Sequence, residues 1–320
     1  MTAAAGVPAR DAAIRAGSKS FALASQLFDE ETRGRVWDLY AWCRHLDDVT
    51  DGQVLGHGRT EVADRAARVA DLRRRSERAL RGKTGDGPAF DGLARVAATT
   101  GLPARYVHDH LEGFEMDASG RRYVSLDDTL SYCYHVAGAV GLMMAWIMGV
   151  READTLLRGC DLGVAFQLTN IARDVGEDAG AGRVYLPEAW LREHGADLAS
   201  GRPPDAATRE RLAPVVARLL DEADRYYASA WHGVPRLPWR SAWAVATARH
   251  VYRDIGVEVR RRGARAWDGR VVVGGGRKLA RLAQALGEAT WAAAARRRDA
   301  AVPRTGLWTP PGGGHARMTA

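Results

Sequence analysis

The sequence predicts an all-α protein built as a single helical bundle. Apolar residues recur at spacings of three and four along several long segments rich in Ala, Leu and Arg, as they do on the buried face of a helix. The sequence contains no alternating Val, Ile and Thr runs and no Asn-Gly hairpin of the kind that joins strands. The breaks between the segments are short, as connections between packed helices usually are.

Six segments show the helical pattern most clearly. In chain order they span residues 31–49, 59–81, 125–149, 154–175, 206–231 and 241–262. Gly and Pro interrupt the pattern, and connections are therefore expected at residues 82–88, 101–103, 201–204, 235–238 and 274–276.

These segments predict one all-helical domain over residues 17–298, preceded by an N-terminal segment of residues 1–16. Residues 299–320 contain three prolines and a run of three glycines, and they are expected to form a disordered tail. The longest uncharged apolar run, from Val136 to Val150, is shorter than the roughly 20 residues that a membrane span needs. We expect it to be a buried helix.

The composition excludes several classes of protein. Of the 320 residues, 46% are hydrophobic and 27% are charged, which is near the average for globular chains and excludes a disordered chain, a collagen or a disulfide-stapled mini-protein. The three cysteines are widely spaced and form no CxxC pair, so neither a zinc site nor a disulfide framework is expected. With no apolar signal-peptide core near the N-terminus, a cytoplasmic location is expected.

The formal charge of +7 narrows the possible partners only a little. Just three of the 46 basic residues are lysines, and the arginines are scattered among acidic residues. No basic helix or aromatic-interleaved patch is found, so we do not expect a nucleic-acid partner. A basic balance remains compatible with phosphorylated substrates or membrane headgroups.

A first unusual feature is a stripe of polar residues along the helix expected at 31–49. The residues Tyr40, Arg44, Asp47 and Asp51 are four, three and four positions apart, so on a helix they lie on one face. Asp47 and Asp51 are one helical turn apart, close enough for both carboxylates to bind the same cation.

A second stripe repeats this geometry. The residues Gln167, Asn170, Asp174 and Asp178 follow steps of three, four and four. Each stripe ends in two carboxylates four positions apart and lies among apolar neighbours. On facing helices of a bundle, the two stripes would flank a central cavity.

The carboxylates of both stripes need positive partners, since two unit charges ~4 Å apart interact by about 4 kcal/mol at an effective dielectric constant of 20. Ligands that are all oxygen, without Cys or a well-spaced His pair, favour Mg²⁺, with Mn²⁺ as an alternative. An acid-rich helix end is also often a solvated, ion-paired surface. The match between the two stripes favours the metal site over that interpretation.

Long sequence blocks around the stripes resemble the squalene and phytoene synthase family, and most closely its bacterial phytoene synthases. In order, these blocks are GSKSFALAS (17–25), LYAWCRHLDDVTD (39–51), YCYHVAGAVGLMMA (132–145), CDLGVAFQLTNIARDVGEDAGAGRVYLP (160–187) and SAWAVATARHVYRDIG (241–256). The resemblance implies an isoprenoid synthase fold, an all-α bundle with a cavity between two aspartate helices. It also implies a prenyltransferase that joins two geranylgeranyl diphosphates head to head, through prephytoene diphosphate, to phytoene in carotenoid biosynthesis.

The resemblance implies roles for individual residues. Metal ligands are implied at Asp47, Asp51, Asn170, Asp174 and Asp178, and the four aspartates among them are the expected catalytic residues. Substrate-binding positions are implied at Ser18, Lys19, Ser20, Tyr40, Arg44, Gln167, Arg173 and Tyr252. Further contacts with diphosphate or cavity are expected from Arg183, Tyr185 and Lys278. The implied cofactor is Mg²⁺, and no NADPH is expected.

Two alternatives remain open within the sequence. The same chemistry on farnesyl diphosphate would give squalene, dehydrosqualene or hydroxysqualene, and only the depth of the cavity distinguishes the two. A catalytically inactive scaffold protein is a second alternative, although both carboxylate pairs are complete.

The implied product also suggests partners. A forty-carbon hydrocarbon without polar groups must leave into a bilayer or a downstream phytoene desaturase. We therefore expect peripheral association with the inner face of the membrane, helped by basic helical surface at residues 260–262. The alternative is that these arginines form an ordinary solvated face.

Overall fold

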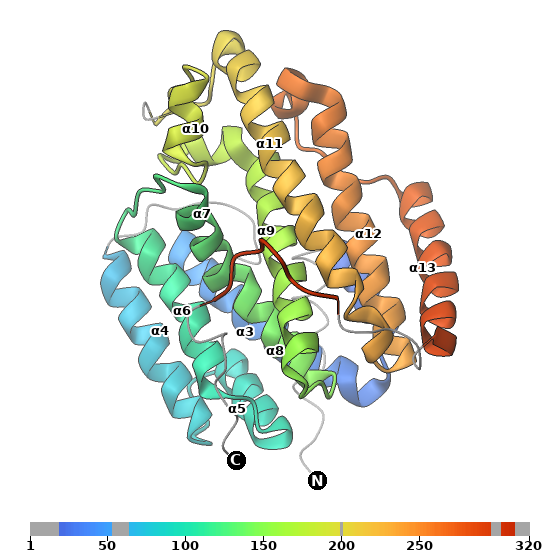
Figure 1. The fold of residues 1–320 in the computed structure, drawn as a ribbon. Coiled ribbons are helices and arrows are strands. Elements are labelled where there is room, and N and C mark those ends of the chain that lie inside the picture. Colours follow the sequence, from blue (N-terminus) through green and yellow to red (C-terminus); the bar gives the residue numbers. More distant parts are fainter. Residues whose placement is uncertain (1–18, 53–63, 199–200, 296–301, 311–320) are drawn as a thin grey trace.

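The computed structural model describes residues 19–52, 64–198, 201–295 and 302–310, and within these ranges it contains helices and connections but no strand (Figure 1). The all-α prediction is confirmed. The α-helices are α2 (Lys19–Ser25), α3 (Glu30–Asp51), α4 (Arg65–Leu80), α5 (Pro88–Thr100), α6 (Ala104–Ala118), α7 (Leu126–Cys133), α8 (Ala139–Ile147), α9 (Ala153–Gly180), α10 (Glu188–Glu193), α11 (Ala206–Trp231), α12 (Trp239–Arg262) and α13 (Gly275–Ala295). The shorter turns are η1 (Tyr134–Gly138), η2 (Val234–Arg236) and η3 (Gly263–Trp267).

Each of the six expected helical segments corresponds to helix in the structure, with most ends shifted by a few residues. The structure adds α2, α5, α6 and α10, which were not among the expected segments. It also differs at residues 274–276, because α13 begins at Gly275 where a connection was expected. Burial of Ala285, Ala289 and Ala292 against the bundle stabilises α13 despite the poor helix propensity of its first residues.

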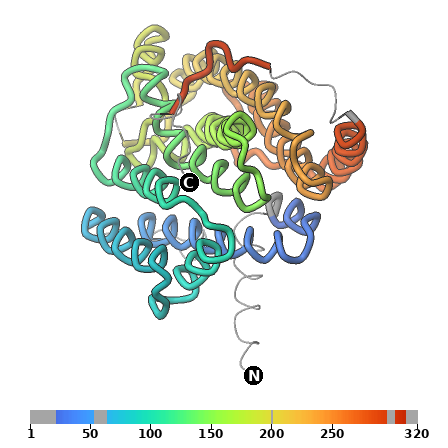
Figure 2. Tube along the Cα trace, turned by 60° about the horizontal axis from the view of Figure 1, so that its bottom comes forward, coloured from blue at the N-terminus to red at the C-terminus, as the bar shows by residue number. Residues whose placement is uncertain are grey.

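Helix α9 is the central element of the bundle and packs against α8, α11 and α12 (Figures 1 and 2). Glycines let α8 and η1 approach it backbone to backbone. A Cβ atom on Gly141 would lie 2.1 Å from the carbonyl oxygen of Gly159, and one on Gly163 would lie 2.1 Å from that of Ala137. Close approach of these helices brings the apolar α8 face directly beside α9.

The continuous helical stretch Leu126–Ile147 is long and apolar enough to cross a membrane by length and composition alone. In the structure, 67% of its apolar window is buried inside the bundle. This burial agrees with the expectation that the apolar run from Val136 to Val150 forms a buried helix.

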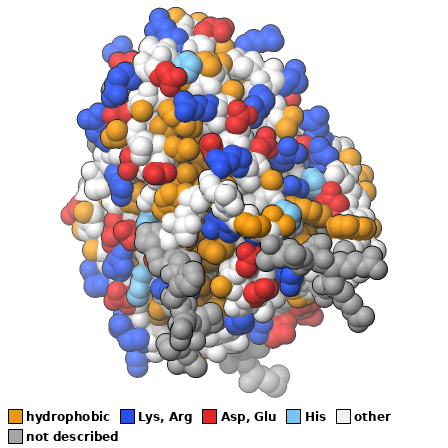
Figure 3. Space-filling model, in the orientation of Figure 1, with side chains coloured by type: hydrophobic (Ala, Val, Ile, Leu, Met, Phe, Trp, Pro, Cys, Tyr) orange, Lys and Arg blue, Asp and Glu red, His pale blue; other side chains and the backbone are white. Residues whose placement is uncertain are grey.

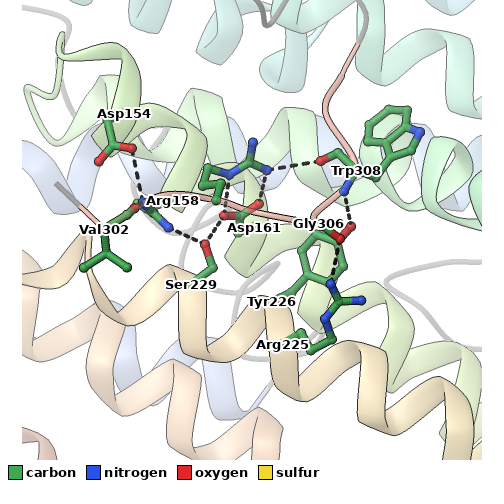
Figure 4. Close-up of polar contacts among 10 residues, drawn as sticks. Asp154, Arg158, Asp161, Arg225, Tyr226, Ser229, Val302, Gly306 and Trp308 are labelled. Atoms are coloured by element: carbon green, nitrogen blue, oxygen red, sulfur yellow. Dashed lines mark hydrogen bonds and ion pairs between the residues drawn. The ribbon is translucent and has the colours of Figure 1, made fainter.

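The described part of the C-terminal tail differs from the disorder expected for residues 299–320. Residues 302–310, which we call the C-terminal strap, lie across α9 and α11 (Figure 4). Arg304 donates to both carboxylate oxygens of Asp161, at 2.9 and 2.5 Å, and the backbone N–H of Trp308 donates to the hydroxyl of Tyr226 at 3.1 Å. Residues 1–16 and the rest of the tail lie outside the described residues.

A buried charge explains why the strap packs. Asp161 has no exposed surface, and Ser229 donates a third hydrogen bond to it at 2.5 Å. A carboxylate so buried is costly unless a cation compensates it, and Arg304 supplies that charge. The composition of the tail did not indicate that Arg304 pairs with Asp161, because Asp161 lies 143 positions earlier in the chain.

Candidate active site

Two adjoining compartments lie between the helices, one apolar and one polar. The apolar cavity has a volume of about 320 Å³ and the polar compartment about 740 Å³. Val136, Gln167 and Asn170 line both, so the two compartments meet at this point.

The apolar cavity is lined mainly by small and aliphatic side chains from α2, α3, α8, α9 and α12. Val140, Met144 and Met148 line it from one face of the apolar run, at the helical spacing expected. Phe166 and Tyr252 also line the cavity, and their rings stack with centroids 4.2 Å apart. A cavity of this kind holds hydrocarbon chains and keeps water away from them.

The stripe on α3 faces the compartments because the opposite face of the helix is buried. Trp42 and Leu46 of that face have no exposed surface. The helix begins at the capping residue Asp29, whose carboxylate accepts from the backbone N–H of Thr32 at 2.8 Å. Tyr40 lines the apolar cavity, and the polar compartment is lined by Arg44, Asp47 and Asp51.

The stripe on α9 is positioned in the same way. Leu168, Ala172 and Val175 are buried in the bundle, so the stripe turns toward the polar compartment, where it contributes Gln167, Asn170, Asp174 and Asp178. All five predicted metal ligands therefore line one compartment, with carboxylates contributed by two helices.

Two of these carboxyl groups are strongly perturbed. Burial, together with repulsion from Asp51, raises the pKa of Asp47 to about 7, although Arg44 opposes the shift. Burial and repulsion from Asp174 raise the pKa of Asp178 to about 7. In both groups burial is the larger cause and a neighbouring carboxylate adds to it, and a bound cation would oppose both effects.

Arginines already compensate part of this charge. Arg44 donates to Asp48 at 2.7 Å and lies 3.8 Å from Asp47. The guanidinium of Arg183 donates to Asp51 at 2.5 Å, across 132 positions of the chain. These guanidinium groups border the compartment, where a bound diphosphate would find them.

On α9, Arg173 donates to its neighbour Asp174 through Nε at 2.7 Å. Arg270 approaches the same stripe from the loop after η3, lying 3.8 Å from Asp174 and 3.3 Å from Glu177. The sequence reasoning missed Arg270, because a loop residue shows no periodicity that would place it near α9.

The sequence reasoning also missed Asp117 of α6. The hydroxyl groups of Tyr132 and Tyr185 each donate to its carboxylate at 3.0 Å, and the two rings stack 4.6 Å apart. Burial raises the pKa of Asp117 above its usual range. A signal was present, since His110, Phe114 and Asp117 form a stripe with steps of four and three, and all three line the polar compartment.

The remaining predicted residues divide into three groups. Tyr185 and Arg183 line the polar compartment, and Tyr252 lines the apolar cavity. Lys278 lies at the start of α13, outside the lining of both compartments. Ser18 lies outside the described residues, as do the side chains of Lys19 and Ser20, so their role stays a prediction.

The donor set fits a hard divalent cation, because the carboxylates and the Asn170 amide supply only oxygen ligands. Among the described residues, no three His, Cys, Asp or Glu side chains are gathered closely enough to hold an ion alone. Mg²⁺ commonly binds through one or two carboxylates and substrate phosphate oxygens, so this arrangement suits an ion that arrives with a diphosphate.

Comparison with known proteins agrees with this geometry. The family model for squalene/phytoene synthase matches residues 14–277. The chain belongs to this family. A relative from Enterobacter agglomerans, named 15-cis-phytoene synthase, is 50% identical over 301 residues, covering 93% of this chain and 100% of the relative.

A second relative of the same name, from Pantoea ananas, is 50% identical over 275 residues, covering 85% of this chain and 88% of the relative. A solved structure of a dehydrosqualene synthase in complex with ligand is 27% identical and has a TM-score of 0.77. It covers 89% of this chain, and this chain covers 96% of it. The isoprenoid synthase fold expected from the resemblance is thereby confirmed.

Proposed function

We propose that this protein is a phytoene synthase, a transferase that joins two geranylgeranyl diphosphates head to head. The observation that carries the proposal is the junction of a carboxylate-lined polar compartment with an apolar cavity at Gln167 and Asn170. Several relatives 46–50% identical over most of the chain carry the name phytoene synthase, which supports this choice of substrate.

The proposed reaction proceeds in two ionisations. One geranylgeranyl diphosphate loses its diphosphate, and the allylic cation attacks the double bond of the second, giving prephytoene diphosphate after loss of a proton. The second diphosphate then leaves, the cyclopropylcarbinyl cation rearranges, and loss of a further proton gives phytoene. No reductant is consumed, so NADPH is not required.

Residues of the polar compartment would stabilise the leaving diphosphates. Mg²⁺, or Mn²⁺ in its place, would be held by Asp47, Asp51, Asn170, Asp174 and Asp178, and when bound it supplies positive charge to the departing oxygens. Arginines at the border of the compartment would bind the same oxygens through charge-assisted hydrogen bonds; these are Arg44, Arg173 and Arg183.

The apolar cavity would hold the hydrocarbon chains during the carbocation steps. Its aliphatic and aromatic walls, including Met144 and Phe166, exclude water that would otherwise capture a cation. Tyr40 and Tyr252 line the cavity beside this wall, where they would contact the substrate chain as the family resemblance implies.

The direct test is a product assay with the purified full chain. Labelled geranylgeranyl diphosphate and farnesyl diphosphate are supplied separately, each with Mg²⁺ and with a chelator. We expect a forty-carbon hydrocarbon from the longer substrate only in the presence of metal. No product from either substrate would contradict the proposal and favour the scaffold interpretation.

A squalene-type synthase is the second candidate, and the structural similarity to a dehydrosqualene synthase favours it. It predicts a thirty-carbon product from farnesyl diphosphate in the same assay. The sequence relatives named phytoene synthase are more similar to this chain, at 46–50% identity against 27% for that structure, so we rank it second.

We also propose that the protein works at the inner face of the membrane as a peripheral protein. The proposed product has no polar group and is insoluble in water, so it must pass to a bilayer or directly to a phytoene desaturase. We expect the protein to co-purify with the membrane fraction and to be released from it by high salt or by detergent.

A further inference from the structure

The basic surface at residues 260–262, expected to attract lipid, is partly neutralised by acidic neighbours. Arg260 donates to Asp221 at 2.7 Å, and both Arg261 and Arg262 donate to Glu258 at 2.7 to 2.8 Å. Two carboxylates therefore compensate two of the three positive charges, which weakens the attraction of this surface for anionic headgroups and favours a search for a membrane-binding surface elsewhere.

Helix α13 presents such a surface at one edge of the bundle, where it packs only on α12 and η2 among the main described contacts (Figures 1 and 2). Leu279 is 65% exposed, Leu286 37% and Trp291 60%. Trp239 of α12 is 39% exposed and donates to the hydroxyl of Thr290 at 3.4 Å, which joins it to this surface. We call these exposed side chains the α13 outer face.

The α13 outer face carries no charge. From Leu279 to its end at Ala295, the helix has two charged side chains, and both turn inward onto α12. Arg281 donates to Asp254 at 2.7 and 2.8 Å, and Glu288 lies 2.7 Å from the ring nitrogen of His250. The other exposed residues over this length are alanine, glycine, glutamine and threonine. In Figure 3, hydrophobic side chains gather at the right-hand edge, where Figure 1 places α13.

Cations lie at the start of this uncharged face, where Arg277 and Lys278 belong to the first turn of α13. The side chain of Arg277 is 54% exposed and lies 3.9 Å from Asp254, a carboxylate that already accepts two hydrogen bonds from Arg281, so Arg277 keeps positive charge. An apolar helix face with Trp and Leu, flanked by basic residues, is typical of helices that lie in the interface of an anionic membrane.

The surface is also close to the hydrocarbon cavity. Ala244, Ala248 and Tyr252 of α12 line the cavity, while Trp243 of the same helix donates to the carbonyl oxygen of Leu282 in α13 at 3.0 Å. One layer, α12, therefore separates the cavity from α13. A bilayer on the outer face would lie within about two helix diameters, roughly 20 Å, of the product.

We propose that the α13 outer face is the surface through which this protein docks on an anionic lipid bilayer. This inference rests on the proposed function, because it is the hydrocarbon product that requires a nearby bilayer. The exposed apolar side chains enter the headgroup region, and the basic residues at the start of the helix contact anionic headgroups.

The test is sedimentation of the full chain with vesicles of phosphatidylcholine alone or mixed equally with phosphatidylglycerol. We expect the wild-type chain to pellet with the anionic vesicles at low salt. The double variant Leu279→Glu/Trp291→Glu should lose at least tenfold in the bound fraction. Val124→Glu/Val302→Glu, at side chains 52% and 42% exposed on other parts of the molecule, adds the same two charges, so it is the matched control and should bind like wild type.

Three results would overturn the docking proposal: wild-type protein that does not bind anionic vesicles, a double variant that still binds, or a wild-type dimer that dissociates in the double variant. The last would show that the face joins two copies of the chain. Product formation in detergent micelles is measured in parallel and should be equal in all variants. Vesicle binding without any product would contradict the proposed function instead.

Discussion

The polar compartment and the apolar cavity are formed by the same helices but are held in different ways. Within α9, the lining residues change from Gly163 and Phe166 in the apolar cavity to Asp174 and Asp178 in the polar compartment over about four turns, with Asn170 shared. The polar end is fixed by ion pairs between distant chain positions. The apolar end is fixed by close packing of backbones and aromatic rings. Substitutions in the polar compartment should therefore change ionisation of the diphosphate, and substitutions in the apolar cavity should change binding of the hydrocarbon chain.

The largest effect is expected from removing a carboxylate of the polar compartment. Asp174→Asn should lower kcat at least about 100-fold, because the leaving diphosphate loses electrostatic stabilisation. Circular dichroism and Tm should stay near wild type. Asp154→Asn, at the other end of the same helix, is the matched control and should keep its activity. Near-normal turnover by Asp174→Asn would contradict the metal assignment.

A smaller and more selective effect is expected from narrowing the apolar cavity. Ala248→Phe adds a ring to the cavity wall. We expect kcat/KM for geranylgeranyl diphosphate to fall about tenfold, within the range that a few methylene groups of misfit produce. The measurement is the ratio of the kcat/KM values for the twenty-carbon and fifteen-carbon substrates, which should fall in the variant if the cavity selects chain length. An equal loss with both substrates would show that the cavity does not select chain length.

Removal of the metal should affect ligand binding in the polar compartment and not in the apolar cavity, and this can be measured without substrate turnover. Inorganic diphosphate with Mg²⁺ is expected to raise Tm by several degrees, since a ligand at 100 times its Kd stabilises by about 2.7 kcal/mol. Chelator should abolish the shift. Asp174→Asn should lose it, and Ala248→Phe should retain it. A shift that survives chelation would indicate that the arginines alone hold diphosphate.

The smallest effect on turnover is expected outside both compartments, at the C-terminal strap. Arg304→Met leaves Asp161 buried and uncompensated, and should lower the free energy of unfolding by about 3 kcal/mol. The double variant Arg304→Met/Asp161→Leu should recover most of that loss, measured by urea unfolding. Activity per folded molecule should change less than twofold. A larger loss of activity would connect the strap to the site.

The sequence predicted the parts of the site that lie on regular helices. The spacing of Asp47 and Asp51, and of Asp174 and Asp178, is a local property that helical geometry converts directly into one face. Asp117 shares this property, but its stripe contains a single carboxylate and was not recognised. Periodicity therefore identified the helices with paired acids and missed the helix with one.

Helical periodicity could not predict contacts between segments that are distant in the sequence. Arg270 lies in a loop, and its approach to α9 depends on how η3 and α12 fold back. The strap packs because Asp161 is buried, a fact that no local pattern around Arg304 reveals. Such long-range charge pairs depend on burial, and burial follows from the assembled bundle.

The two compartments are proposed to act differently, because the polar compartment ionises the diphosphate while the apolar cavity only holds the chain. The most direct measurement is the rate of diphosphate release from geranylgeranyl diphosphate with Mg²⁺, in wild type, Asp174→Asn and Ala248→Phe at saturating substrate. We expect diphosphate release that is nearly absent in Asp174→Asn and within a few-fold of wild type in Ala248→Phe. Normal release by Asp174→Asn, or release lost equally in both variants, would contradict it.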